Sequence, residues 1–145
     1  MDLKERGLFL FTEGMSSDEL KSTASKAENL GYGAIWYPEA AGREPFSTAA
    51  IILSATKTLT AATGIVNLYG RDAMVCATGQ QTLNEMSGGR FLLGLGVSHR
   101  LFVEGRGHSY EKPLATMRGY VSAIAECHKM ISVTKNLAVT GIEEQ

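Results

Sequence analysis

This sequence contains little cysteine, almost no net charge and no long apolar run. Its two cysteines, Cys76 and Cys127, fit no zinc-ligand spacing and are too few for a disulfide-stapled secreted domain. A formal net charge of −1 at pH 7 gives no reason to expect binding to nucleic acid or to an anionic membrane. Charges of both signs, at Asp2, Lys4, Glu5 and Arg6, crowd the start of the chain, which does not resemble a signal peptide, and no apolar stretch is long enough to span a bilayer. We therefore expect a cytoplasmic protein.

Short apolar runs alternate with segments of helical period, and this alternation repeats along the chain. The run GLFLF is followed by a capping-box pattern at Ser16 and Glu19. Pro45 suits the first turn of a second helix, and Asp72 suits the N-cap of a third. The pattern predicts strands over residues 7–11, 34–37, 59–66 and 90–97, helices that begin near residues 17, 45, 73 and 113, and a long loop over residues 98–112.

This order predicts an α/β fold of four consecutive βα units over residues 1–129. Strands that are apolar throughout are buried on both faces, which implies a parallel sheet flanked by helices. A doubly wound open sheet and part of a (β/α)8 barrel both have this pattern, and the near-equal length of the units favours the barrel. Residues 130–145 form a C-terminal tail, either a short strand over 135–142 or a frayed end. Trp36 is expected in the core and Tyr37 at its rim.

The stretch GGRFLLGLGVSH, residues 88–99, decides between a phosphate-binding loop and a buried strand. A phosphate-binding fingerprint needs its glycines just after a strand, in the turn that opens a helix. Here Gly88 and Gly89 precede the predicted strand, while Gly94 and Gly96 lie inside it. Glycines inside a strand indicate that a flat ring or a neighbouring backbone comes close. The placement therefore disfavours a nucleotide-binding doubly wound domain.

Four motifs carry a resemblance to a known family. They are GYGAIWYPEAAGREPF, TAATGIVNLYGRDAM, LNEMSGGRFLLGLGVSH and GHSYEKPLATMRGYV. Together they resemble the luciferase-like monooxygenase superfamily, and most closely its branch of coenzyme F-420-dependent oxidoreductases. The resemblance runs from about Leu8 to about Tyr120. It implies a (β/α)8 TIM-type barrel that binds a deazaflavin or FMN and transfers hydride or, in the flavin branches, activates oxygen.

The resemblance covers half of such a barrel, since barrels of this type have about 250 residues. The chain is then either a fragment or a half-barrel that finds its other half, and the family's phosphate-binding loops lie in the unmatched half. Four parallel strands leave two open edges and an apolar face uncovered. We therefore expect self-association into a homodimer or higher oligomer that completes the ring.

Glu39 and Arg43 follow the second predicted strand, at the edge where parallel α/β proteins build their sites. The resemblance implies a general acid or base at this place. Glu39 is thus a candidate catalytic residue that relays a proton, and Arg43 a candidate that holds an anionic group of the cofactor or substrate. The alternative is an ion pair between the two within the loop.

Gly64, Ile65 and Asn67 end the third predicted strand. The resemblance implies that a backbone bulge here, often with a non-proline cis peptide, lies behind the cofactor ring. Asn67 would then bond the polar edge of the ring, so all three are candidate cofactor-binding residues. The alternative is an ordinary strand end with Asn67 in a turn.

Ser98 and His99 follow the fourth predicted strand. Ser98 is a candidate cofactor-binding residue, and His99 is a candidate catalytic residue because imidazole suits proton transfer near neutral pH. The alternative for His99 is a loop histidine bonded to a carbonyl. The spacing of histidines and carboxylates matches no metal site, so no metal is expected.

Two functions remain open from the sequence. The first is an oxidoreductase that acts on a small-molecule substrate with coenzyme F-420, or with FMN as the alternative. The second is a non-catalytic half-barrel, an assembly module or remnant, in which the cofactor is absent. Whether this chain is itself an enzyme stays open.

Overall fold

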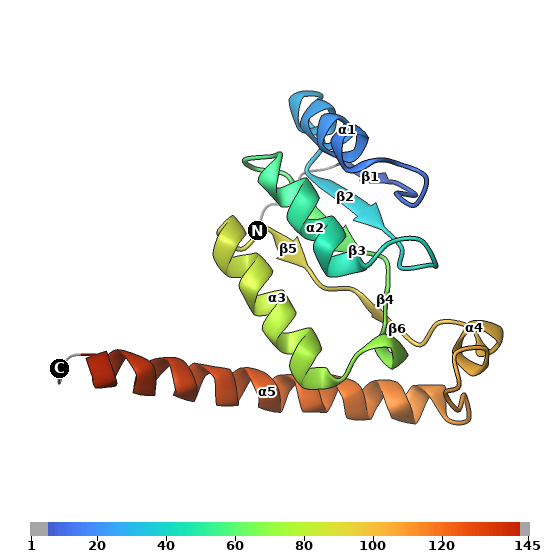
Figure 1. The fold of residues 1–145 in the computed structure, drawn as a ribbon, viewed down its shortest axis with the longest axis vertical. Helices are drawn as coiled ribbons and strands as arrows, with labels where there is room; N and C mark the ends of the chain where they lie inside the picture. Colours follow the sequence, from blue (N-terminus) through green and yellow to red (C-terminus); the bar gives the residue numbers. More distant parts are fainter. Residues whose placement is uncertain (1–5, 143–145) are drawn as a thin grey trace. The chain divides into compact units, whose positions relative to one another are not determined.

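The first part of the chain is organised around a parallel sheet with helices on one face (Figure 1). The structure is a computed structural model that describes residues 6–142, with side chains described for residues 6–132. It divides into two compact units, the first comprising Met1–Asn67 with Gly79–Gly96 and the second Leu68–Thr78 with Val97–Gln145.

The elements follow one another as the alternating pattern predicts. Their bounds are β1 (Gly7–Phe9), α1 (Ser17–Asn29), β2 (Ala34–Tyr37), α2 (Pro45–Ser54), β3 (Thr60–Thr63), β4 (Val66–Asn67), a 3-10 turn (Leu68–Gly70), α3 (Ala73–Ser87), β5 (Phe91–Leu92), β6 (Leu95–Gly96), α4 (Arg100–Glu104) and α5 (Pro113–Ile142). A four-stranded sheet has the order β1-β2-β3-β5, and β4 pairs with β6. Every pair is parallel, which confirms the α/β fold with a parallel sheet.

Several local signals are confirmed residue by residue. Ser16 caps α1, its hydroxyl accepting from the Glu19 backbone N–H, and the Glu19 carboxylate accepts from the Ser16 N–H at 2.7 Å. Pro45 is the first residue of α2. The Asp72 carboxylate accepts from the Val75 N–H at 2.9 Å at the start of α3. These signals depend on chemistry within one turn, so the sequence alone reveals them.

Four predictions about the elements are wrong. The strand expected over 59–66 is divided into β3 and β4, and the one over 90–97 into β5 and β6. The loop expected over 98–112 contains the helix α4. The short strand expected over 135–142 is absent, because α5 continues as one helix to Ile142. The rest of that tail, residues 143–145, lies outside the described residues, and the predicted boundary at 129 stays a prediction.

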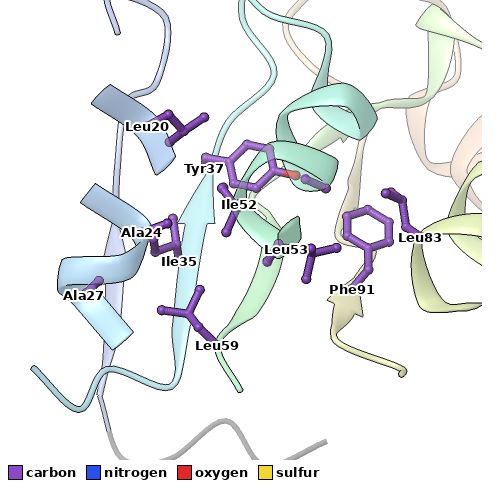
Figure 2. Packing of buried hydrophobic residues seen from close by; sticks show 12 residues of the cluster. Leu20, Ala24, Ala27, Ile35, Tyr37, Ile52, Leu53, Leu59, Leu83 and Phe91 are labelled. Carbon is purple, nitrogen blue, oxygen red and sulfur yellow. The ribbon is translucent and has the colours of Figure 1, made fainter. Parts of the chain in front are cut away.

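The hydrophobic core lies between the helices and one face of the sheet. Figure 2 shows side chains of α1, α2 and α3, such as Leu20, Ile52 and Leu83, packed beside Ile35 of β2 and Phe91 of β5. The strand register adds Leu8 and Ala61 to the row on this face. Tyr37 belongs to this core, with 1% of its surface exposed, and its hydroxyl donates to the Pro45 carbonyl at 2.8 Å. Burial raises the pKa of Tyr37, and the Glu44 charge adds to the rise. The expectation that Tyr37 lies at the rim is therefore wrong.

The opposite face of the sheet carries the next row of side chains. In register these are Phe9, Trp36, Ala62 and Leu92, because successive residues of a strand point to opposite faces. Trp36 is half-buried on this face and does not belong to the core where it was expected. Phe9 is 54% exposed and stacks edge to face on Phe11, which is 70% exposed. This face, called here the open face, therefore exposes aromatic surface.

The amino ends of the strands are fixed by two charged side chains. Arg90 donates five hydrogen bonds, to the carbonyl oxygens of Leu53, Thr56, Leu59 and Ser87 and to the Thr56 hydroxyl. The Glu28 carboxylate accepts from the backbone N–H groups of Lys57, Thr58 and Leu59. Burial alone would raise the pKa of Glu28, but these hydrogen bonds together lower it. Burial lowers the pKa of Arg90, and the Glu28 charge opposes that change.

The second unit contains α4, the first turns of α3 and the long helix α5. The Tyr120 hydroxyl on α5 donates to the Arg71 carbonyl oxygen at 2.9 Å. Tyr69 lies with its ring centroid 6.0 Å from those of both His108 and Tyr110, and Arg100 lies over the Tyr110 ring. Within the described residues, no helix has the length and apolar character needed to cross a membrane.

Candidate functional site

The candidate site in the first unit lies at the carboxyl ends of the strands. Because β1, β2, β3 and β5 are parallel, their carboxyl ends meet at one edge of the sheet. The segments that follow β1, β2 and β3 are joined there by hydrogen bonds between loops. These segments contain five of the predicted site residues, namely Glu39, Arg43, Gly64, Ile65 and Asn67.

Glu39 connects the end of β2 to the start of β4. Its backbone N–H donates to the Ile65 carbonyl oxygen at 3.0 Å, and its carboxylate Oε2 accepts from the Asn67 N–H at 2.7 Å. The structure thus brings Glu39, Ile65 and Asn67 together, as the sequence predicts. Glu39 is half-buried, so its carboxylate is held in place and is not wholly withdrawn from solvent.

Hydrogen bonds join the break between β3 and β4 to the break between β5 and β6. The Thr63 hydroxyl donates to the Gly94 carbonyl oxygen at 3.0 Å and accepts from the Gly94 N–H at 2.8 Å. A Cβ on Gly94 would lie 2.1 Å from the Thr63 carbonyl oxygen, which is closer than any side chain tolerates. The prediction that a neighbouring backbone approaches this glycine is confirmed.

Gly64 and Ile65 form the connection between β3 and β4, and the peptide bond between them is cis, as the resemblance implies. The position of a Cβ on Gly64 lies 3.6 Å from the Phe9 ring and 3.8 Å from the Trp36 ring. Ile65 is half-buried and Asn67 is buried. Asn67 belongs to β4 and pairs with Gly96, so the alternative that it lies in a turn is wrong.

Arg43 is half-buried in the loop between β2 and α2. Its guanidinium donates to the Met15 carbonyl oxygen, so its described contact is a main-chain acceptor and not the Glu39 carboxylate. This contact is therefore not the loop ion pair with Glu39 that the sequence left open as the alternative. Arg43 provides a cation at this end of the sheet.

Glu13 is a residue that the sequence reasoning missed. Its carboxylate Oε1 accepts from the Ala41 N–H at 2.8 Å, and its side chain fills the space where a Cβ on Gly42 would lie, at 3.1 Å. Glu13 thus joins the loop after β1 to the loop after β2. Its place in the segment after β1, like that of Glu39 after β2, is a signal that could have identified it.

Ser98 and His99 follow β6 in the chain and belong to the second unit. Ser98 has φ of 57°, and its carbonyl oxygen accepts from the Tyr110 hydroxyl at 3.2 Å. His99 is exposed at the N-cap of α4, where its side chain makes no capping hydrogen bond, and its ring centroid lies 6.2 Å from that of Phe102. The predicted cofactor contact of Ser98 and the catalytic role of His99 stay predictions.

The residues at the carboxyl ends offer an apolar surface beside polar groups. The part of the chain that the structure describes contains no cluster of three or more histidine, cysteine, aspartate or glutamate side chains suited to a metal ion. Gly64 and Ile65 with the rings of Phe9 and Trp36 give a surface against which a flat ring could pack. Glu39, Asn67 and Arg43 give an acid, an amide and a cation at the same edge. This combination fits the ring of a flavin or deazaflavin, which has apolar faces and a polar rim.

Comparison with known proteins identifies relatives of this chain. The 5,10-methylenetetrahydromethanopterin reductase of Methanolobus tindarius is 34% identical over 102 residues, which are 70% of this chain and 31% of that protein. The chain therefore spans about a third of the length of this curated relative.

Two solved structures share the fold. The coenzyme F420 dependent tetrahydromethanopterin reductase of Methanopyrus kandleri has a TM-score of 0.72 at 19% identity, covering 81% of this chain and 38% of that one. Monooxygenase RslO1 of Streptomyces bottropensis has a TM-score of 0.72 at 21% identity, covering 81% and 41%. The model of the luciferase-like monooxygenase family matches residues 3–135, which is most of the sequence. The chain belongs to the luciferase-like monooxygenase family.

Proposed function

We propose that this chain carries the ring-binding surface of an oxidoreductase that uses coenzyme F-420, with FMN as the alternative. The observation that carries the proposal is a pair of hydrogen bonds at the carboxyl ends of the strands. The Glu39 carboxylate accepts from the Asn67 N–H, and the Glu39 N–H donates to the Ile65 carbonyl oxygen. The coenzyme F-420 dependence of the relative from Methanopyrus kandleri supports the choice of cofactor. When bound, the coenzyme would supply or accept the hydride in a reaction with a small-molecule substrate.

Gly64 and Ile65 would hold the ring. The Phe9 and Trp36 rings line the backbone at Gly64, and Ile65 would provide an apolar contact for the ring beside them. The Asn67 side chain would bond the polar edge of the ring. Because the backbone of this segment is already hydrogen bonded to Glu39 and to Gly94, the surface is fixed before the coenzyme binds.

Glu39 would hold or move the proton that accompanies hydride transfer. A carboxylate fixed by a backbone N–H at 2.7 Å keeps its position relative to the ring surface, which is what a general acid or base requires. Arg43 would bind an anionic group of the coenzyme or the substrate. On the resemblance, we propose Ser98 as a cofactor contact and His99 as a second proton-transfer residue.

Equilibrium titration with coenzyme F-420 and with FMN, followed by fluorescence and absorbance, tests the proposal. We expect saturable binding of at least one coenzyme, retained in Glu39→Gln and weakened in Arg43→Gln. Lys21→Gln is the matched control, because Lys21 makes only an exposed contact to Asp18 at 3.5 Å. If folded protein binds neither coenzyme, the chain as given does not carry a ring-binding surface, and the non-catalytic half-barrel is the better account.

We also propose that the open face packs against further strands, in the simplest case those of a second copy. Phe9 and Phe11 expose aromatic surface there, and β1 and β5 are the outer strands of the four-stranded sheet. A sheet with open edges and an apolar face associates readily. Sedimentation velocity should show a dimer or a higher oligomer that Phe9→Lys with Phe11→Lys dissociates. A wild-type protein that stays monomeric at high concentration would contradict self-association.

A further inference from the structure

The side chain of Ile65 occupies the space above Gly96. A Cβ on Gly96 would lie 2.5 Å from Ile65 Cγ1, 2.7 Å from Cδ1 and 3.0 Å from Cβ. Rotation of the Ile65 side chain would move Cγ1 and Cδ1 away from the new atom, and the remaining contact to Ile65 Cβ, at 3.0 Å, needs a shift of only a few tenths of an ångström. Position 96 therefore tolerates a side chain only if Ile65 changes position.

The backbone around Ile65 is held on several sides. The Gly64 N–H donates to the Tyr37 carbonyl at 2.8 Å, the Ile65 carbonyl accepts from Glu39 at 3.0 Å, and the Val66 N–H donates to Gly94 at 2.7 Å. Moving this segment would break hydrogen bonds to two neighbouring parts of the sheet. A larger residue at position 96 would therefore displace the Ile65 side chain before it displaces the backbone.

We propose that Gly96 is a positioning residue for Ile65, and that the missing side chain sets how far Ile65 projects into the ring-binding surface. This inference rests on the proposed function, because it assigns Ile65 the contact with the ring. Ile65 is half-buried, so part of it is accessible to a ligand, and a side chain pushed away from Gly96 would change that accessible part. A ring that packs against Ile65 in the wild-type protein would then collide with the displaced side chain before it reached its binding position.

Coenzyme affinity in a double-mutant cycle tests the proposal. Gly96→Ala should weaken binding of coenzyme F-420 by about tenfold or more, which corresponds to about 1.4 kcal/mol. Ile65→Ala alone should weaken binding because the ring contact is lost, but in the Gly96→Ala background it should recover part of the affinity, because the obstructing side chain is gone. If the loss of affinity in the double variant equals the sum of the losses in the two single variants, the proposal is overturned.

The same cycle read by urea unfolding needs no coenzyme. Gly96→Ala should lower the unfolding midpoint, and Ile65→Ala should restore part of it, although Ile65→Ala alone lowers the midpoint. If Gly96→Ala does not fold, the double variant must fold for the proposal to stand. The control is Gly119→Ala on α5, where the new Cβ meets nothing within 4 Å and the midpoint should not fall.

These readouts separate the two proposals. If wild-type protein binds no coenzyme but the unfolding cycle shows coupling, the proposed function fails while the contact between Gly96 and Ile65 stands. If wild-type protein binds and Gly96→Ala binds equally well, the positioning role of Gly96 is overturned while the proposed function stands. An unfolding cycle without coupling would overturn the contact itself.

Discussion

The two ends of the sheet in the first unit are built differently. At the amino ends, the Arg90 and Glu28 side chains make several hydrogen bonds each to residues 56–59, the segment before β3, and most of these bonds are to main-chain groups. At the carboxyl ends, the strands are interrupted at Gly64 and Gly94, and the Glu39 and Arg43 side chains each bond a main-chain group of a neighbouring segment. We propose that the amino ends hold the fold together, while the carboxyl ends, where the strands are interrupted, present groups to a ligand, as in barrels of parallel strands.

The largest effect on stability is expected where the carboxyl end is most crowded. Gly94→Ala places a Cβ 2.1 Å from the Thr63 carbonyl oxygen, so the strands must separate. We expect the free energy of unfolding to fall by about 3 kcal/mol or more, the range of severe backbone clashes. Urea unfolding followed by circular dichroism measures it. Gly14→Ala, where the new Cβ meets nothing within 4 Å, should be nearly neutral, and equal effects of the two would contradict the account.

Removal of the amino-end cation is expected to come next. Arg90→Met leaves the carbonyl oxygens of Leu53, Thr56 and Leu59 without their donor, and we expect a loss of about 2–4 kcal/mol in unfolding free energy. Coenzyme affinity of the folded variant should not change, because Arg90 lies at the opposite end of the strands from the ring-binding surface. A large loss of coenzyme affinity in folded Arg90→Met would break the comparison between the ends.

Glu28→Gln should have a smaller, pH-dependent effect. The folded-state pKa of Glu28 lies below the usual value of 4.5, so its charge stabilises the fold above that value and the contribution disappears as the pH falls through the folded-state pKa. We expect wild type to exceed Glu28→Gln by about 1 kcal/mol in unfolding free energy near pH 7. The difference should shrink as the pH is lowered below about 4. A difference that stays constant with pH would show that shape, and not charge, holds the loop.

Glu39→Gln is expected to change stability least and reaction rate most. The amide oxygen can still accept from the Asn67 N–H, so we expect a loss of less than about 1 kcal/mol in unfolding free energy. If Glu39 transfers the proton, turnover with a hydride acceptor should fall by about a hundredfold or more. Stopped-flow absorbance of the coenzyme measures the rate. Unchanged turnover in the folded variant would remove Glu39 from the chemistry.

Much of the fold could be predicted from the sequence because its signals are local. The strand at residues 34–37, the cap at Ser16 and the start of α2 at Pro45 each depend on neighbours within a few residues. The exchanged places of Trp36 and Tyr37 could not be predicted this way. Strand alternation puts them on opposite faces, but only the helices that pack on one face determine which side is the core.

The candidate site was predictable in position but not in its connections. The rule that residues after parallel strands gather at one edge found Glu39, Ile65 and Asn67. The roles of Thr63 and Glu13 depend on contacts between residues about 30 apart in sequence, such as that between Thr63 and Gly94, and one sequence carries no sign of such pairs. The helix α4 was missed because its five residues are too few to show a helical period.

Hydrogen exchange with and without coenzyme F-420 tests the central claim most directly. If the carboxyl ends of the strands bind the ring, exchange of the backbone amides in residues 38–43 and 64–67 should slow when the coenzyme is added. Amides of residues 57–59, held by Glu28 at the other end, should exchange at the same rate in both samples. Protection confined to residues 57–59, or no change in folded protein at saturating coenzyme, would contradict the account.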